Sequence, residues 1–308
     1  MKHLYLTVLI GLCLGVSFSS CNEDDLTPSE DNHMMTFPQG DADYDKEILA
    51  IYNEYGTHMI YDFNDNQFRW EVTSQLPYMS EKGDTDYVSD AVYFIQKNCL
   101  ELYDKDFVKE LLPYRIFLAS NISKIWNYSG YIDANWNWAE EHDTIPGVGA
   151  INGYKSIGFG FTSKRLNELD DDSLAIVKAE LNASLIASGV ENGLIEIPEE
   201  FDALAAANKD NLWYANFIDA YSGYNSVGLL EYADPQTITV ADEFNQYVKY
   251  LIMLTDEEFD SRFLNSTFDA GGYVAQKKPI VKNWLKEKYG INIEEIVNKP
   301  ILLKFKSE

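Results

Sequence analysis

The chain has 308 residues and a formal net charge of −26, from 50 acidic and 24 basic side chains. Such an acidic surface repels nucleic acid and anionic lipid, since both are bound through cationic patches, so the composition argues against DNA or RNA as partners. Hydrophobic residues make up 46% of the chain, which suits one large domain or two packed lobes.

The first residues have the order of an export signal. Lys2 gives a basic start, and the apolar run Leu4–Val16 is too short to span a membrane. The next segment, Phe18–Cys21, resembles a bacterial lipobox, in which two small residues precede the cysteine that receives the lipid. We therefore expect a signal peptide at 1–20 and a membrane anchor on Cys21; the alternative is a plain secretory signal with an incidental cysteine.

Residues 21–40 are expected to form a flexible acidic tether, because they are polar and contain Pro28 and Pro38. The acidic run Asn22–Asp25 resembles the export tag that sends some lipoproteins to the outer face of the outer membrane. The expected location is the outer membrane, facing the exterior, although an ordinary solvated tether would look similar. The folded domain is expected at 41–308.

Three cysteines are present, at 13, 21 and 99. Cys13 leaves with the signal peptide and Cys21 is used by the lipid, so no pair remains for an intramolecular disulfide. Cys99 lies in a helical apolar pattern and is predicted to be a buried small hydrophobe.

Helices and strands alternate in the first half of the domain. Apolar spacing predicts a helix at Tyr44–Tyr55, ended by Gly56, and a long helix at Asp84–Tyr103. Strands are predicted at Met59–Phe63, Gln67–Val72, Tyr114–Ala119 and Ile151–Phe161. Asn64–Asn66 is predicted to be the turn between the first two strands; its oxygen-rich neighbourhood lacks the glycine and final glutamate of a calcium loop.

The second half is mainly helical. Asp170–Asp172 are placed to cap a helix at Ser173–Ala187, which Gly189 is expected to end. Further helices are predicted at Glu199–Ala207, Ala241–Leu254 and Gly272–Tyr289, with a short closing strand at Ile301–Phe305. This order predicts an α+β fold, with a mixed sheet and helices in an N-terminal lobe to about residue 190 and a helical lobe at 191–308.

Several segments resemble a family of gut-bacterial lipoproteins described as zinc-binding metallopeptidases or import-associated zinc metallohydrolases. They are Tyr44–Glu47, Tyr61–Phe63, Phe68–Trp70, Leu112–Leu118, Ile197–Asp202 and Ala241–Phe244. The resemblance implies a zincin-like body, a zinc cofactor, and partnership with a TonB-dependent nutrient importer and its glycan- or peptide-binding lipoprotein.

The chain departs from the family at the zinc-binding motif, His-Glu-x-x-His. Two His at i and i+4 share a helical face and can hold one Zn²⁺, while the Glu acts as general base. Here Ala179 and Ala183 stand at the His positions and only Glu180 remains. The family's later acidic ligand would fall at Asp242 or Glu243, where it has no zinc to complete, so we expect the metal to be lost.

The same helix has the apolar pattern of a helix packed in a core. Ile176, Ala179, Ala183 and Ile186 fall on one stripe, which predicts burial rather than a metal face. Of the remaining histidines, His58 is expected in or beside a strand. His142, with the neighbouring acids 140, 141 and 143, is an alternative ion site.

Aromatic residues cluster between 126 and 138, among Asn, Ser and Gly. They are Trp126, Tyr128, Tyr131, Trp136 and Trp138. Rigid aromatic faces beside amide donors suit contact with a glycan or a peptide, whereas the alternative is a hairpin that packs its aromatics over its own sheet.

Three functions stay open at the level of sequence. The first is a non-catalytic binding or accessory protein of an outer-membrane nutrient-uptake system, a metallopeptidase-like pseudoenzyme. The second is an active hydrolase, either metal-dependent through other ligands or acid-based with Glu180. The third is a purely structural envelope protein.

Overall fold

The computed structural model describes residues 36–72, 75–132, 136, 138–208, 227–231, 233 and 238–304, with backbone alone at 127–132 and 138–142. The chain separates into two compact units, Met1–Thr36 and Phe37–Glu308, and nearly all of the described residues belong to the second. The predicted signal peptide, Cys21 and most of the predicted tether lie outside the described residues.

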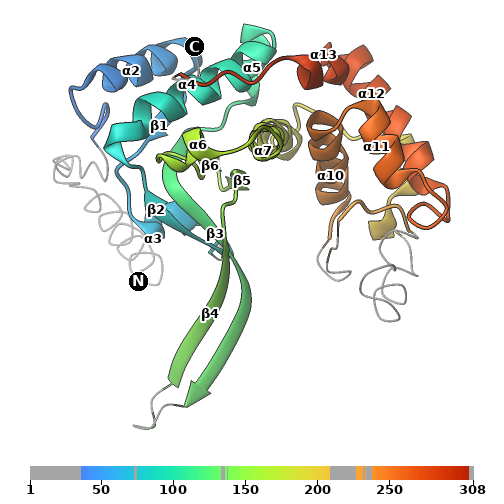
Figure 1. Ribbon diagram of the computed structural model, residues 1–308, viewed down its shortest axis with the longest axis horizontal. Helices are drawn as coiled ribbons and strands as arrows, with labels where there is room; N and C mark the ends of the chain where they lie inside the picture. The colour runs from blue at the N-terminus through green and yellow to red at the C-terminus, as the bar shows by residue number, and fades with distance from the viewer. Residues whose placement is uncertain are drawn as a thin grey trace, which may run out of the picture. The chain divides into compact units, whose positions relative to one another are not determined.

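A six-stranded mixed sheet is built around β3 (Arg115–Ile132). β1 (His58–Ile60) and β6 (Ser156–Phe159) pair with its first residues in parallel, and β5 (Ala150–Gly153) lies antiparallel to β6 at the edge. Beyond them, β2 (Tyr78–Lys82) and β4 (Trp138–Pro146) pair with β3 antiparallel (Figure 1). Past Lys124, β3 is paired with β4 alone, as a two-stranded hairpin.

The central strand is apolar without alternation because both of its faces are covered. Ile116, Phe117, Leu118 and Ala119 are all at most 1% exposed. A continuous apolar run of this kind is typical of a strand with parallel neighbours in a buried sheet. The sequence therefore locates the core strand, although its outer part was not predicted.

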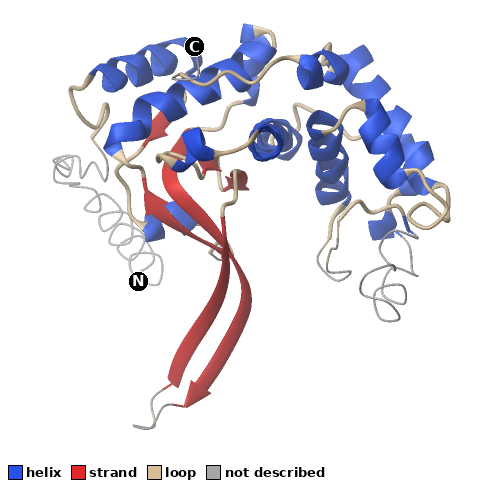
Figure 2. Ribbon diagram, in the orientation of Figure 1, coloured by secondary structure: helices blue, strands red, loops and turns tan. Residues whose placement is uncertain are grey.

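Helices lie before and between the strands, and they make up most of the described chain after the last strand (Figure 2). In the N-terminal half they are α2 (Asp43–Tyr55), α3 (Asp65–Arg69), α4 (Val88–Asn98), α5 (Lys105–Leu111) and α6 (Arg165–Glu168). Then follow α7 (Asp171–Glu191), α8 (Glu199–Leu204), α10 (Val240–Met253), α11 (Asp256–Phe263), α12 (Tyr273–Tyr289) and α13 (Ile293–Asn298). The mixed sheet followed by a helical half confirms the predicted α+β class.

Helix α7 lies between the sheet and α10 (Figure 1). It begins as predicted, with Asp170 accepting a hydrogen bond from the Ser173 N–H at 2.8 Å. By length and composition alone α7 could cross a membrane, but 67% of its apolar window is buried inside the fold. It is the central core helix of the described domain.

The predicted hairpin at Met59–Val72 is wrong in its second strand, which is helix α3. Asn64 accepts a hydrogen bond from the Gln67 N–H at 3.0 Å, and the Gln67 side chain accepts one from the Asn64 N–H at 2.8 Å. This reciprocal capping makes the expected turn residues the start of a helix. Asp65 is engaged as well, since it accepts from the Ser80 N–H.

Two further boundaries differ from prediction. The expected strand Ile151–Phe161 is the hairpin β5–β6, which turns at Tyr154 and Lys155. Helix α7 continues past Gly189 to Glu191, because Gly189 has a packing role: an added Cβ would lie 2.5 Å from Leu111 Cδ2.

The predicted closing strand is also wrong for residues 301–304, which are irregular. Asn98 holds this segment instead, by donating to the Leu302 carbonyl and accepting from the Leu302 N–H, each at 2.9 Å. Cys99 beside it is 1% exposed, and burial raises the pKa of its thiol, so the predicted buried position is confirmed.

Candidate functional site

The helix face that matches the zinc motif is largely buried. Ala179, Ala183 and Ile186 are 0%, 2% and 1% exposed, as the apolar stripe predicts. Ile176 departs from the prediction, since it is 43% exposed and lies at the margin of the buried face. The two positions at which the resemblance would place histidine are thus packed alanines.

Glu180 is held by the backbone at the start of β5. Its Oε2 accepts hydrogen bonds from the N–H groups of Gly149, at 2.7 Å, and Ala150, at 3.4 Å. Burial raises the pKa of this carboxyl, and the opposing effects of Lys249 and the two N–H groups are smaller. Glu180 is therefore a fixed, partly desolvated carboxyl.

The acids expected near a third metal ligand have structural roles. Asp242 accepts from the N–H and the hydroxyl of Thr239, at 2.8 and 2.7 Å, and so caps α10. Glu243 forms an ion pair with Lys277, in which both side chains are 0% exposed, and also accepts from the Ala206 N–H at 2.7 Å.

A zinc site needs three or four N, S or O ligands around one point. Within the described residues, no group of three or more His, Cys, Asp or Glu is placed to hold a metal ion. Alanine at 179 and 183 offers no ligand, and the Glu243 carboxylate is already neutralised by Lys277. The residues at the motif positions do not fit zinc.

The other histidines add no site where they can be described. His58 is surrounded by the rings of Phe37, Tyr52 and Tyr114, at centroid distances of 4.5–4.6 Å, and burial lowers its pKa. It lies in β1, as predicted. The His142 side chain, with those of residues 140 and 141, lies outside the described residues.

The aromatic segment forms the outer part of β3, β4 and the connection between them. Trp126 and Trp136 are 62% and 87% exposed, so neither packs its ring over the sheet. Trp138 pairs with Ile132 through the backbone. The side chains of Tyr128, Tyr131 and Trp138 lie outside the described residues, and their predicted binding role stays a prediction.

A cavity of about 550 Å³ lies at the Glu180 face of α7, and we call it the cleft. It is bordered by β5, α7 and α10, with Tyr78 from β2. Its polar and charged lining residues are Tyr78, Lys124, Asn152, Glu180, Ser184, Glu191, Glu231, Asp242, Asn245 and Lys249. Val148, Ile151, Ile186, Val190 and Phe244 are among its apolar lining residues.

The end of the cleft near Glu180 has mixed charge. Lys249 forms an ion pair with Glu231, and the Gln246 side chain fixes Glu231 by accepting its N–H at 3.2 Å. Burial, together with Glu180 and Glu231, raises the pKa of Tyr78. This end therefore places a partly desolvated carboxyl, a phenol and a neutralised lysine around one space.

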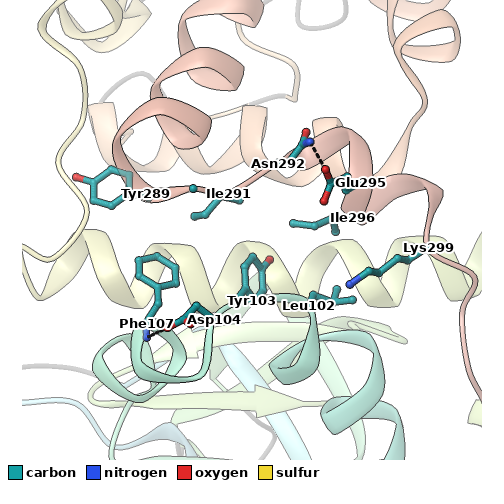
Figure 3. A pocket seen from close by; sticks show the side chains of 11 residues that line it. Leu102, Tyr103, Asp104, Phe107, Tyr289, Ile291, Asn292, Glu295, Ile296 and Lys299 are labelled. Atoms are coloured by element: carbon teal, nitrogen blue, oxygen red, sulfur yellow. Dashed lines mark hydrogen bonds between the residues drawn. The ribbon is translucent and has the colours of Figure 1, made fainter.

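A smaller cavity of about 180 Å³ lies between α5, the end of α12 and α13 (Figure 3). Several of its polar groups already have partners. Asn292 donates to Glu295 at 2.7 Å, Asp104 caps α5 at its N-terminus, and the Tyr103 hydroxyl donates to Asn182 at 2.7 Å. Lys299, which is exposed, also lines the cavity. Among the described residues, none of the buried side-chain atoms without a hydrogen-bond partner belongs to this cavity.

No protein-family model matches the chain, and no curated protein matches it. A similar solved structure is that of a candidate zinc-binding metallo-peptidase from Bacteroides caccae ATCC 43185, determined at 2.10 Å. The identity is 14%, the TM-score is 0.49, and the match covers 82% of this chain and 88% of that one. The similarity to that protein is one of fold.

Sequence reasoning found Glu180 but missed most of the cleft. Asn152 is a polar residue beside Ile151 in a predicted strand, which is a weak signal, whereas Asn245 lies among other polar residues and gave none. Glu231 and Lys249 gave no signal, because their pairing depends on how the segment 227–231 packs against α10.

Proposed function

We propose that this protein is a lipid-anchored component of the outer-membrane surface that binds its ligand without hydrolysing it, as an accessory part of a nutrient-uptake system. The observation that carries the proposal is the state of the motif helix. Ala179 and Ala183 are buried, and the remaining Glu180 is engaged by the N–H groups of Gly149 and Ala150. A carboxyl held in this way has no metal-bound water to activate.

The location is proposed from the sequence of the leader. Cys21 follows a lipobox-like segment, and acidic residues follow Cys21 at once. Several acyl chains on one cysteine would anchor the domain stably. We expect Cys21→Ala to release the protein from the membrane fraction, and protease added to intact cells to digest the wild-type protein. Retention of the Cys21→Ala variant in the membrane would contradict the anchor.

Metal content tests the non-catalytic part directly. The mature protein would be exposed to zinc, desalted and measured by plasma mass spectrometry, with a functional zinc peptidase treated in parallel. We expect zinc far below one ion per chain. Near-stoichiometric zinc would overturn the proposal and would point to ligands among residues that the structure leaves undescribed.

A second function is favoured by one observation, the raised pKa of Glu180 in a cavity that also contains Tyr78 and Glu231. A carboxyl whose pKa is raised by burial holds its proton to a higher pH, as a general acid must, so an acid-based hydrolase is the alternative. Hydrolysis of peptides or glycans that disappears in Glu180→Gln would establish it. Equal hydrolysis by wild type and Glu180→Gln would trace the activity to a contaminant.

A further inference from the structure

The cleft contains a concentration of buried polar atoms that have no hydrogen-bond partner in the protein. Five such side-chain atoms occur in the described residues, and three of them belong to cleft residues: both amide atoms of Asn152 and Oδ1 of Asn245. A polar atom hidden from water without a partner lowers stability by about 1–3 kcal/mol. Two such residues around one cavity make the cleft a candidate ligand site.

These amides lie at one end of the cleft. Asn152 in β5 is close to Glu191 at the end of α7, and Glu191 in turn interacts electrostatically with Asp242 at the start of α10. Asn245 follows Asp242 by three residues, hence on the same face of α10. At the opposite end, Glu180 interacts with Lys249, so α7 and α10 line the cleft in antiparallel directions.

The amide end contains hydrogen-bond acceptors in excess. Asn152 and Asn245 offer unpartnered amide oxygens, and Glu191 and Asp242 are exposed carboxylates at the mouth. Partial burial raises the pKa of the Glu191 carboxyl, and the nearby Asn152 and Lys155 side chains partly offset this rise. The Asn152 amide is not in hydrogen-bonding geometry with the carboxylate. A ligand that matches these acceptors has a positively charged hydrogen-bond donor.

The rest of the cleft sets the shape of the ligand. From Glu180 to Glu191, α7 contributes eleven residues of length, about 16 Å at 1.5 Å per residue. Ile186 and Val190 on α7, Ile151 on β5 and Phe244 on α10 give this length an apolar lining. The space therefore suits an extended apolar stem rather than a compact group.

We propose that the cleft binds an elongated organic cation, a primary ammonium or guanidinium group on an apolar stem, with the cationic head between Asn152, Asn245 and Glu191. The inference rests on the proposed function, because it treats the cleft as a binding surface. A neutral sugar fits less well, since it would add no positive charge beside the carboxylates at the mouth and would leave the apolar lining without a complementary surface.

Titration calorimetry on the purified mature protein tests this with pentylamine and hexylamine as probes, because each has one ammonium head on an apolar stem. Glucose and 1-pentanol are the neutral comparisons, and a blocked lysine peptide tests whether the same head group is taken from a side chain. We expect both amines to bind and the neutral probes not to bind. Stronger binding of the blocked peptide would assign the head group to a peptide, and binding of glucose alone would overturn the proposal.

Two variants locate the site. Glu191→Gln and Asn245→Leu are each expected to weaken amine binding by about 10- to 100-fold, as loss of a hydrogen bond to a charged group does. Glu257→Gln, on the exposed face of α11, makes the same change of charge away from the cleft and should bind as wild type does. An equal loss in Glu257→Gln would show that the effect is only the net charge.

Asn245→Leu also controls for folding. Removing an unpartnered buried amide oxygen should leave the thermal midpoint unchanged or raise it, while binding is lost. A lowered midpoint would show that Asn245 has a partner and would remove the basis of the proposal. Zinc content and hydrolysis measured on the same samples separate the two claims: bound zinc overturns the proposed function, and absent amine binding overturns this inference alone.

Discussion

The ion pair between Glu243 and Lys277 allows a quantitative test of whether Glu243 is structural. Both side chains are 0% exposed, and Lys277 also donates to the carbonyls of Val227 and Gly228, at 3.2 and 3.4 Å. Lys277→Met would leave the Glu243 carboxylate buried, with hydrogen bonds from the backbone of Ala206 and Ala207 but with no counter-charge. Breaking a buried pair in this way costs about 3–5 kcal/mol of unfolding free energy.

The double variant separates the pair from its surroundings. Glu243→Gln keeps an oxygen that accepts the Ala206 N–H but removes the charge, so combining it with Lys277→Met leaves no unpaired charge. We expect the double variant to lie within about 1–2 kcal/mol of wild type, well short of the sum of the two single losses. If each single variant loses about 3–5 kcal/mol, the interaction free energy should then be at least about 4 kcal/mol.

Urea unfolding followed by both fluorescence and circular dichroism would measure these differences, because agreement of the two probes supports a two-state treatment. Losses that simply add, or a cost below about 1 kcal/mol for Lys277→Met, would refute a tight buried pair. Zinc retention should not change in Glu243→Gln. A change would mean that Glu243 is a ligand after all.

Three further predictions follow from single side chains. Burial lowers the pKa of Lys178 to about 8, so between pH 8 and 10.5 the unfolded state binds more protons than the folded state. Wild type should therefore gain stability relative to Lys178→Met as the pH rises through this range, as urea unfolding would measure. Burial raises the pKa of Glu180, so the folded state binds more protons as the pH rises past 4.5. The stability of Glu180→Gln relative to wild type should therefore increase as the pH rises from 4.5. Gly189→Ala should lower the unfolding free energy by about 1–3 kcal/mol through collision with Leu111, despite the better helix propensity of alanine, and an unchanged thermal melt would contradict that contact.

The sequence predicts elements well where local pattern and tertiary packing agree. α2 begins and ends within one residue of its prediction because Gly56, at φ +81°, stops the helix by itself. Prediction from the sequence fails where one residue type is compatible with two local structures. Asn64 suits a turn and a helix cap equally, and Gly189 suits a helix end and a close approach to Leu111. Only the packed fold decides between such uses.

The candidate site divides in the same way. Glu180 could be found from the motif spacing, because i and i+4 positions share a helical face in any packing. The partners of Asn152 and Asn245 could not, because the cleft exists only where β5, α7 and α10 meet. The acids at 242 and 243 were correctly placed on a helix, but their capping and ion-pair roles depend on Thr239 and on Lys277, 34 residues away.

The two faces of α7 explain how a degenerate motif can leave a useful cavity. One face is fixed to the fold: Lys178 donates to the Ile296 carbonyl at 2.6 Å, and Asn182 donates to the Asn98 carbonyl at 2.8 Å. The other face lines the cleft with Ala183 and Ala187, one turn apart. Alanine at 183 offers no metal ligand, and its small side chain leaves room in the cleft that a histidine would fill. The same residue that argues against zinc therefore also favours the binding of an apolar stem.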